Sequence, residues 1–103
     1  MNKSYSRAIP RRWRDIAKVF VAMGDSHRQR ILLTFERGER LNVGQIAEVS
    51  TLSRSAVSHH LKIMREAGVL ASEKVGKEVY FWIEREALLD ALRDVTEYLR
   101  DHT

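Results

Sequence analysis

The sequence predicts a mostly α-helical fold with a β-hairpin wing, which is the winged helix-turn-helix architecture. Two capped helical segments lie on either side of a three-residue connector at 50–52, as in a helix-turn-helix. After Gly68 the apolar pattern changes from helical spacing to alternation, which predicts two short strands. The chain has 103 residues and fits one domain, expected at 10–103 behind a flexible basic arm at 1–9.

The first two helices are predicted from apolar spacing and from residues that mark helix ends. Apolar side chains recur at helical spacing between Pro10 and Gly24, and again between Asp25 and Gly38. Pro10 suits the first turn of a helix, where its missing N–H costs nothing. Asp25 or Ser26 is expected to cap the second helix.

The helix-turn-helix is predicted from two further caps. Asn42 is expected to cap a short third helix, and Gln45 stands three residues on, as in a capping box. Ser53 is expected to cap a fourth helix that runs to Ala67, and Gly68 suits a left-handed stop. The fourth helix therefore takes the position of a recognition helix.

The wing is predicted from the stretch 69–83, which reads as two strands joined at Gly76 and Lys77. Glycine at the first turn position suits a type II′ hairpin. The segment that follows is helical again, with one apolar stripe at spacings of four, three and four.

The fourth helix is expected to bury one side and to present a polar side to DNA. Its apolar residues Val57, Leu61 and Met64 should pack against Ile46 and Ile31. The polar stripe begins at the helix N-terminus, where N–H groups already favour phosphate. Arginine can pair with guanine, serine is short enough for close approach, and lysine suits a phosphate. The predicted DNA-binding residues are Arg54, Ser55, Ser58, His59 and Lys62, joined by Lys74 and Lys77 at the wing tip.

The adjacent histidines His59 and His60 are not expected to form a metal site. Neighbouring residues on a helix point about 100° apart, so they chelate one ion poorly. We expect His60 to be partly buried and bonded to nearby backbone, and His27 to lie at a helix start as a capping or surface residue. No metal and no cofactor is predicted.

Composition and charge exclude several classes of protein. The chain has no cysteine, which excludes disulfides, thiolate metal sites and thiol redox switches. It also lacks a long apolar run and an apolar N-terminal stretch, so a cytoplasmic protein without membrane contact is expected.

The net charge is +4 and the pI about 9.8. Residues 1–14 hold five bases and no acid, whereas residues 84–103 hold three bases and six acids. A basic body suits a polyanionic partner.

A homodimer is expected because both terminal helices carry more apolar surface than one small core can use. The predicted interface comprises Trp13, Ile16, Phe20, Leu88, Leu92, Val95 and Leu99. An enzyme is not expected, since there is no cysteine nucleophile, phosphate-cradling glycine loop or paired carboxylate and base in a plausible cleft.

Three stretches resemble the ArsR-type winged helix-turn-helix repressors of bacteria and archaea. "VFVAMGDSHRQRILLTF" resembles the opening of that family, although Ser26 replaces the usual proline. "IAEVSTLSRSAVSHHLKIMREAGVL" is similar to its helix-turn-helix, and "VGKEVYFWI" resembles its wing. The resemblance covers about residues 16–99. It implies a homodimeric transcriptional repressor that dimerises through its first and last helices and binds a palindromic operator in double-stranded DNA.

The chain departs from that family's metal-sensing patterns. Family members sense metals through cysteines or through an Asp-x-His pair on the last helix, but Leu92 follows Asp90 here. The carboxylates Asp94, Glu97 and Asp101 form either a solvated acidic face or an oxygen-rich cation site across a dimer. Two alternatives therefore stay open. One is a repressor that senses a metal or an unidentified small-molecule effector without cysteine, and the other is a winged-helix module that binds protein.

Overall fold

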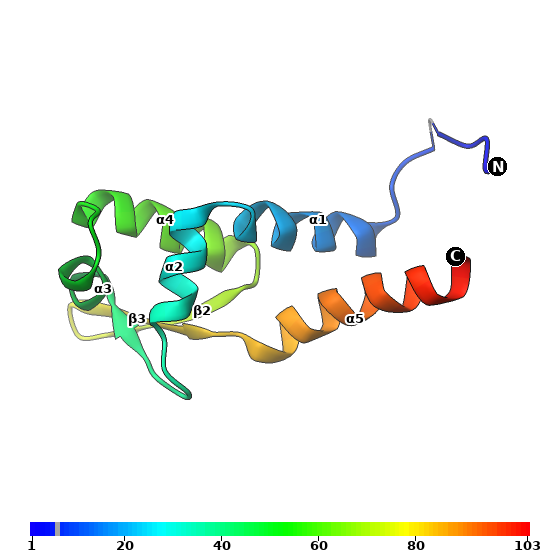
Figure 1. Cartoon of the computed structure of the whole chain (residues 1–103). Coiled ribbons are helices and arrows are strands. Elements are labelled where there is room, and N and C mark those ends of the chain that lie inside the picture. The colour runs from blue at the N-terminus through cyan, green and yellow to red at the C-terminus, as the bar shows by residue number, and fades with distance from the viewer. Residues whose placement is uncertain (6) are drawn as a thin grey trace.

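The computed structural model describes residues 1–5 and 7–103, which form five helices and three strands (Figure 1). In chain order these are α1 (Arg11–Met23), α2 (Ser26–Thr34), β1 (Leu41–Asn42), α3 (Val43–Val49), α4 (Arg54–Glu66), β2 (Leu70–Val75), β3 (Glu78–Ile83) and α5 (Arg85–His102). The prediction of a mostly α fold with a hairpin wing is confirmed. Pro10 is the N-cap of α1 rather than part of its first turn, because its ψ of 146° is extended. Ser6, within the predicted arm, lies outside the described residues.

The helix starts follow the predicted caps. Asp25, rather than Ser26, caps α2, and its carboxylate accepts the backbone N–H groups of residues 27 and 28. Asn42 and Gln45 form the reciprocal capping box of α3. Ser53 caps α4 by accepting the N–H of residue 56. These bonds satisfy amides that have no partner within a helix, so short polar residues fix where each helix begins.

The sheet contains one more strand than the sequence predicts. β2 and β3 pair antiparallel around Gly76, whose φ is 62°, and the described residues include no non-glycine with positive φ. Only the first turn position is therefore left-handed, as in the predicted type II′ turn. The two-residue β1 pairs Leu41 with Phe81 and Asn42 with Tyr80, which gives the order β1-β3-β2. A strand this short has no alternation, so its pattern could not indicate it.

One hydrophobic core holds the helices against the wing. Val57, Leu61 and Met64 are buried in it together with Ile46 and Ile31, as predicted. The wing adds buried residues from both of its strands, and α1 and α5 add others. The inner side of α4 is thus fixed by packing, and its outer side is left to the solvent.

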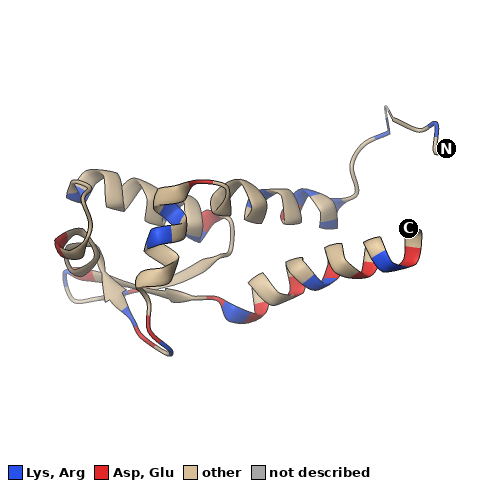
Figure 2. Ribbon diagram, viewed as in Figure 1, with Lys and Arg blue, Asp and Glu red and all other residues tan. Residues whose placement is uncertain are grey.

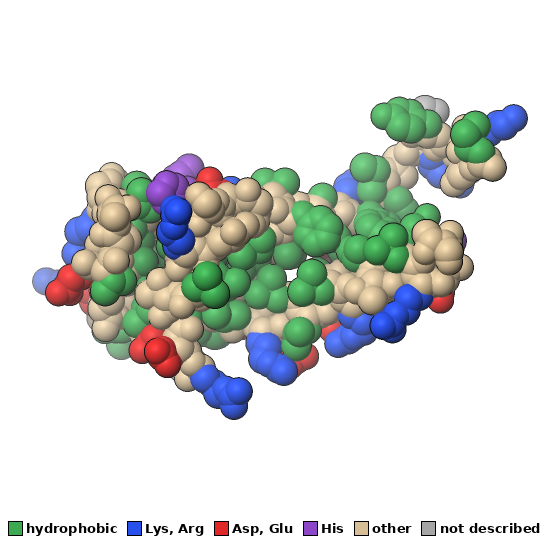
Figure 3. Space-filling model, in the orientation of Figure 1, with side chains coloured by type: hydrophobic (Ala, Val, Ile, Leu, Met, Phe, Trp, Pro, Cys, Tyr) green, Lys and Arg blue, Asp and Glu red, His purple; other side chains and the backbone are tan. Residues whose placement is uncertain are grey.

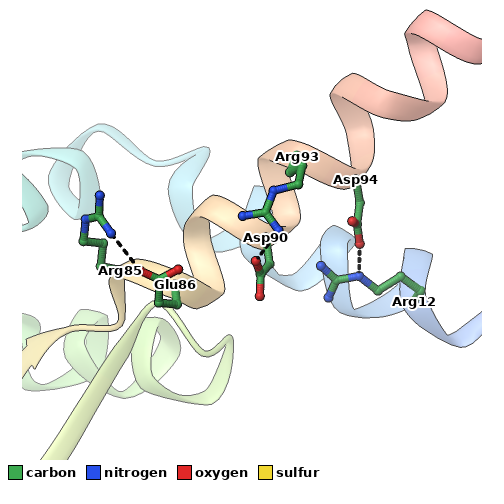
Figure 4. A network of polar contacts seen from close by, with 6 residues as sticks. All are labelled: Arg12, Arg85, Glu86, Asp90, Arg93 and Asp94. Carbon is green, nitrogen blue, oxygen red and sulfur yellow. Dashed lines mark hydrogen bonds and ion pairs between the residues drawn. The ribbon is translucent and has the colours of Figure 1, made fainter.

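The two terminal helices run side by side beyond the core (Figure 1). Trp13 of α1 meets Tyr98 of α5 edge to face, with ring centroids 5.3 Å apart. Arg12 pairs with Asp94 between the same helices (Figure 4). Among the described residues, no helix combines the length and apolar character needed to cross a membrane.

Candidate nucleic-acid interface

The outer side of α4 presents the predicted polar stripe. All five of its residues are exposed, while the apolar residues between them point into the core. Within the stripe, Ser55 Oγ lies 3.2 Å from Oγ of the cap residue Ser53. The stripe is Arg54, Ser55, Ser58, His59 and Lys62. It begins at the N-terminus of a 13-residue helix, so its first residues lie at the positive end of the helix dipole.

A hollow of about 390 Å³ lies between this stripe and the wing tip. Arg54, Ser55 and Ser58 line it from α4, and Lys77 and Glu78 line it from the wing. Figure 2 shows Lys and Arg at the start of α4 and at the wing tip, both at one end of the molecule. Basic and hydroxyl groups, together with the carboxylate of Glu78, therefore line an open hollow that faces the solvent.

The other predicted DNA-binding residues lie around this hollow rather than in it. His59 and Lys62 follow along the exposed side of α4, and Lys74 is exposed on β2, where it pairs with Val79. The structure thus brings Lys77 together with the first part of the stripe. His59, Lys62 and Lys74 extend the polar surface away from the hollow.

His60 has a different partner from the one predicted. Its Nδ1 lies 3.2 Å from Nη1 of Arg28, so it contacts a side chain rather than nearby backbone. Arg28 also donates from Nε to the carbonyl of Ala22 at 2.6 Å and from Nη2 to that of Val21 at 3.2 Å. Sequence reasoning missed Arg28, because nothing local in its pattern indicates a bond to a residue 32 positions away.

The surroundings of His60 favour its neutral form. Burial is the main cause that lowers the pKa of His60; the Asp25 carboxylate opposes this shift, and the Arg28 guanidinium adds to it. The ring of His27 lies 5.8 Å from that of His60, between centroids. His27 thus packs beside His60 instead of capping α2 with its side chain. In residues 1–5 and 7–103, no group of three or more His, Cys, Asp or Glu side chains is placed to hold a metal ion.

The residues predicted for a dimer interface differ in how much surface they offer. Phe20, Leu92 and Leu99 are 47%, 52% and 51% exposed. Trp13, Leu88 and Val95 pack partly against the core. Ile16 is only 2% exposed, because it faces inward from α1, so it has no surface to give to a second chain.

Further apolar side chains on the same two helices are exposed. They are not among the predicted interface residues: Val21, Leu89 and Tyr98. Figure 3 shows hydrophobic side chains gathered along α1 and the facing side of α5. The terminal helices therefore carry an apolar surface that the single chain leaves uncovered.

The acidic residues of α5 are mostly paired with arginine. Asp94 is engaged by Arg12 of α1, and Asp90 accepts from Arg93 at 2.9 Å (Figure 4). Figure 2 shows both signs of charge alternating along this helix. Asp94 is thus paired with an arginine side chain, while Glu97 and Asp101 are exposed, which favours a solvated acidic face.

Comparison with known proteins gives consistent results. The family model described as "Bacterial regulatory protein, arsR family" matches residues 25–72. The transcriptional repressor SdpR of Bacillus subtilis is 30% identical over 81 residues, covering 79% of this chain and 89% of that protein. A transcriptional repressor SmtB homolog of Synechocystis is 31% identical, over 84% of this chain but only 64% of its own length. The solved structure of an ArsR-like transcriptional regulator from Rhodococcus superposes with a TM-score of 0.78 at 26% identity, covering 86% and 83% of the two chains.

Proposed function

Because this chain belongs to the ArsR family of bacterial transcriptional regulators, we propose that it is a homodimeric repressor that binds a specific DNA sequence. In this proposal two copies pair through α1 and α5 and present their α4 helices to a palindromic operator. The half-sites of such an operator lie about one helical turn apart, roughly 34 Å. The protein acts on DNA in the cytoplasm.

The observation that carries this proposal is the exposed stripe of α4 beside the wing tip. A recognition helix enters the major groove with its N-terminal residues, and those residues here are Arg54, Ser55 and Ser58. Arg54 suits guanine, the serines suit bases or phosphates, and Lys62 suits a phosphate. Lys74 and Lys77 at the wing tip suit phosphates or the edge of the minor groove.

Repression and pairing have separate support. Two of the similar proteins are named as transcriptional repressors, which favours repression over activation. The exposed apolar side chains of α1 and α5 favour pairing, since a contiguous apolar surface on a small protein usually marks an interface.

Three alternatives to this function are an enzyme, a protein-binding module and a repressor that senses an effector. The similar proteins are transcriptional regulators and not enzymes. A protein-binding module would suit an apolar recognition face, whereas the stripe of α4 is polar and basic. An effector stays part of the proposal only without cysteine ligands, because the chain has none.

The experiment selects DNA with the wild-type protein from a random duplex library and measures binding to the selected duplex by fluorescence anisotropy. We expect affinity to fall steeply with salt, because bound lysine and arginine displace counterions. Arg54→Ala should cost about 1–3 kcal/mol of binding free energy if it reads a base. The triple variant Arg54→Ala, Ser58→Ala, Lys62→Ala should lose at least about a hundredfold in affinity.

A matched control removes two positive charges elsewhere. Arg37→Ala with Arg85→Ala lowers the net charge as the triple variant does, from exposed positions outside α4. Its effect should be small and independent of DNA sequence. If the triple variant binds the selected duplex as tightly as this control does, the stripe is not the DNA-reading surface.

A further inference from the structure

The side chain of Arg54 lies directly against the backbone of α3. A Cβ built on Gly44 would lie 2.9 Å from Nη1 of Arg54, closer than real Cβ atoms come to other atoms, and at an ordinary contact distance of 3.6 Å from Cζ. A side chain at position 44 would therefore require the guanidinium of Arg54 to shift from its observed place. The atom that would have to move belongs to the flexible end of the arginine, so the fold itself could absorb the change.

The backbone does not require glycine at this position. Gly44 is the second residue of α3, whereas the described glycines with positive φ are Gly38, Gly68 and Gly76. Glycine inside a helix is less favourable than alanine, since it loses more backbone freedom on folding. What the missing side chain of Gly44 does leave is room for the guanidinium of Arg54.

We propose that Gly44 is a positioning residue for Arg54. Its bare backbone forms a slot in which the guanidinium rests, so that Arg54 enters the hollow between α4 and the wing tip beside Ser55, Ser58 and Lys77. A guanidinium recognises guanine or phosphate through two parallel N–H groups, and this geometry is lost when its plane shifts. The inference rests on the proposed function of α4 and extends it to α3.

The test is a double-mutant cycle on the duplex that the wild-type protein selects. Gly44→Ala should weaken binding about fivefold to twentyfold, which is part of the loss expected for a bidentate arginine contact. In the Arg54→Ala background the same substitution should have no further effect, because the side chain it displaces is gone. The midpoint of urea unfolding for Gly44→Ala should be unchanged or higher, which separates positioning from a general loss of structure.

Val49→Ala is the matched control, because it also places alanine in α3, changes no charge, and lies at an exposed position at the other end of the helix. Gly44→Ser adds the same Cβ and should repeat the loss. Wild-type affinity in Gly44→Ala, or a loss that persists in the Arg54→Ala background, overturns this inference alone. Failure of the wild-type protein to select any duplex would instead overturn the proposed function, and this inference with it.

Discussion

At the scale of single residues, the contact between Arg28 and His60 joins the first turn of α2 to the middle of α4. Arg28 has only donors, so the Nδ1 that it approaches at 3.2 Å must accept, which requires a neutral imidazole. The same guanidinium also binds two carbonyls of α1. The contact with Arg28 therefore favours the neutral form of the ring that lies beside the exposed stripe of α4.

This contact predicts a loss of stability in mild acid. Burial lowers the pKa of His60 below its ordinary value of 6.5, so the unfolded chain takes up this proton at a higher pH than the folded one. The stability that neutral His60 contributes is full above the ordinary value and is lost as the pH falls below it. Urea unfolding between about pH 7.5 and 5.0 should show a decline that His60→Gln makes shallower.

His102→Gln serves as the control, because His102 is exposed at the end of α5. It should leave the decline with pH as it is in the wild-type protein. Equal declines for His60→Gln and the wild type would mean that protonation of His60 is not linked to folding.

At the scale of elements, the start of α3 depends on two side chains that bond each other's backbone. Asn42→Ala removes the side-chain acceptor for the backbone N–H of Gln45 and should lower the free energy of unfolding by about 1 kcal/mol. Gln45→Ala removes the reciprocal bond only, so its effect should be smaller. Urea unfolding of the two variants measures both, and a larger loss for Gln45→Ala would contradict the assigned roles.

The elements also mark how far the sequence could predict this structure. Caps, stops and the hairpin turn are local chemistry, which is why Asp25, Asn42, Ser53 and Gly76 could be recognised. β1 could not, because it exists only through its pairing with Phe81 and its neighbour in β3. Three other features depend in the same way on segments that meet only in the folded chain. They are the hydrogen bonds of Arg28, the space at Gly44 that Arg54 fills, and the burial of Ile16.

At the scale of the whole molecule, the basic surface and the apolar surface lie in different places. The start of α4 and the wing tip share one end, and the apolar sides of α1 and α5 extend away from it (Figures 2 and 3). A second copy bound at the terminal helices would thus leave the polar stripe of α4 uncovered in both chains. This separation predicts that pairing can be removed without unfolding the chain or altering the stripe.

Leu92→Glu with Leu99→Glu tests that prediction. Both side chains are about half exposed in the single chain, so the folded monomer can accept the charges. In a dimer they would be buried carboxylates without partners, which cost several kcal/mol, so the dimer dissociation constant should rise at least about a hundredfold. Sedimentation equilibrium should report a folded monomer, and affinity for a palindromic duplex should fall because each monomer holds only one half-site.

Leu33→Glu is the control. Leu33 is exposed on α2, so this substitution should leave the dimer intact. A double variant that still sediments as a dimer would place the interface elsewhere.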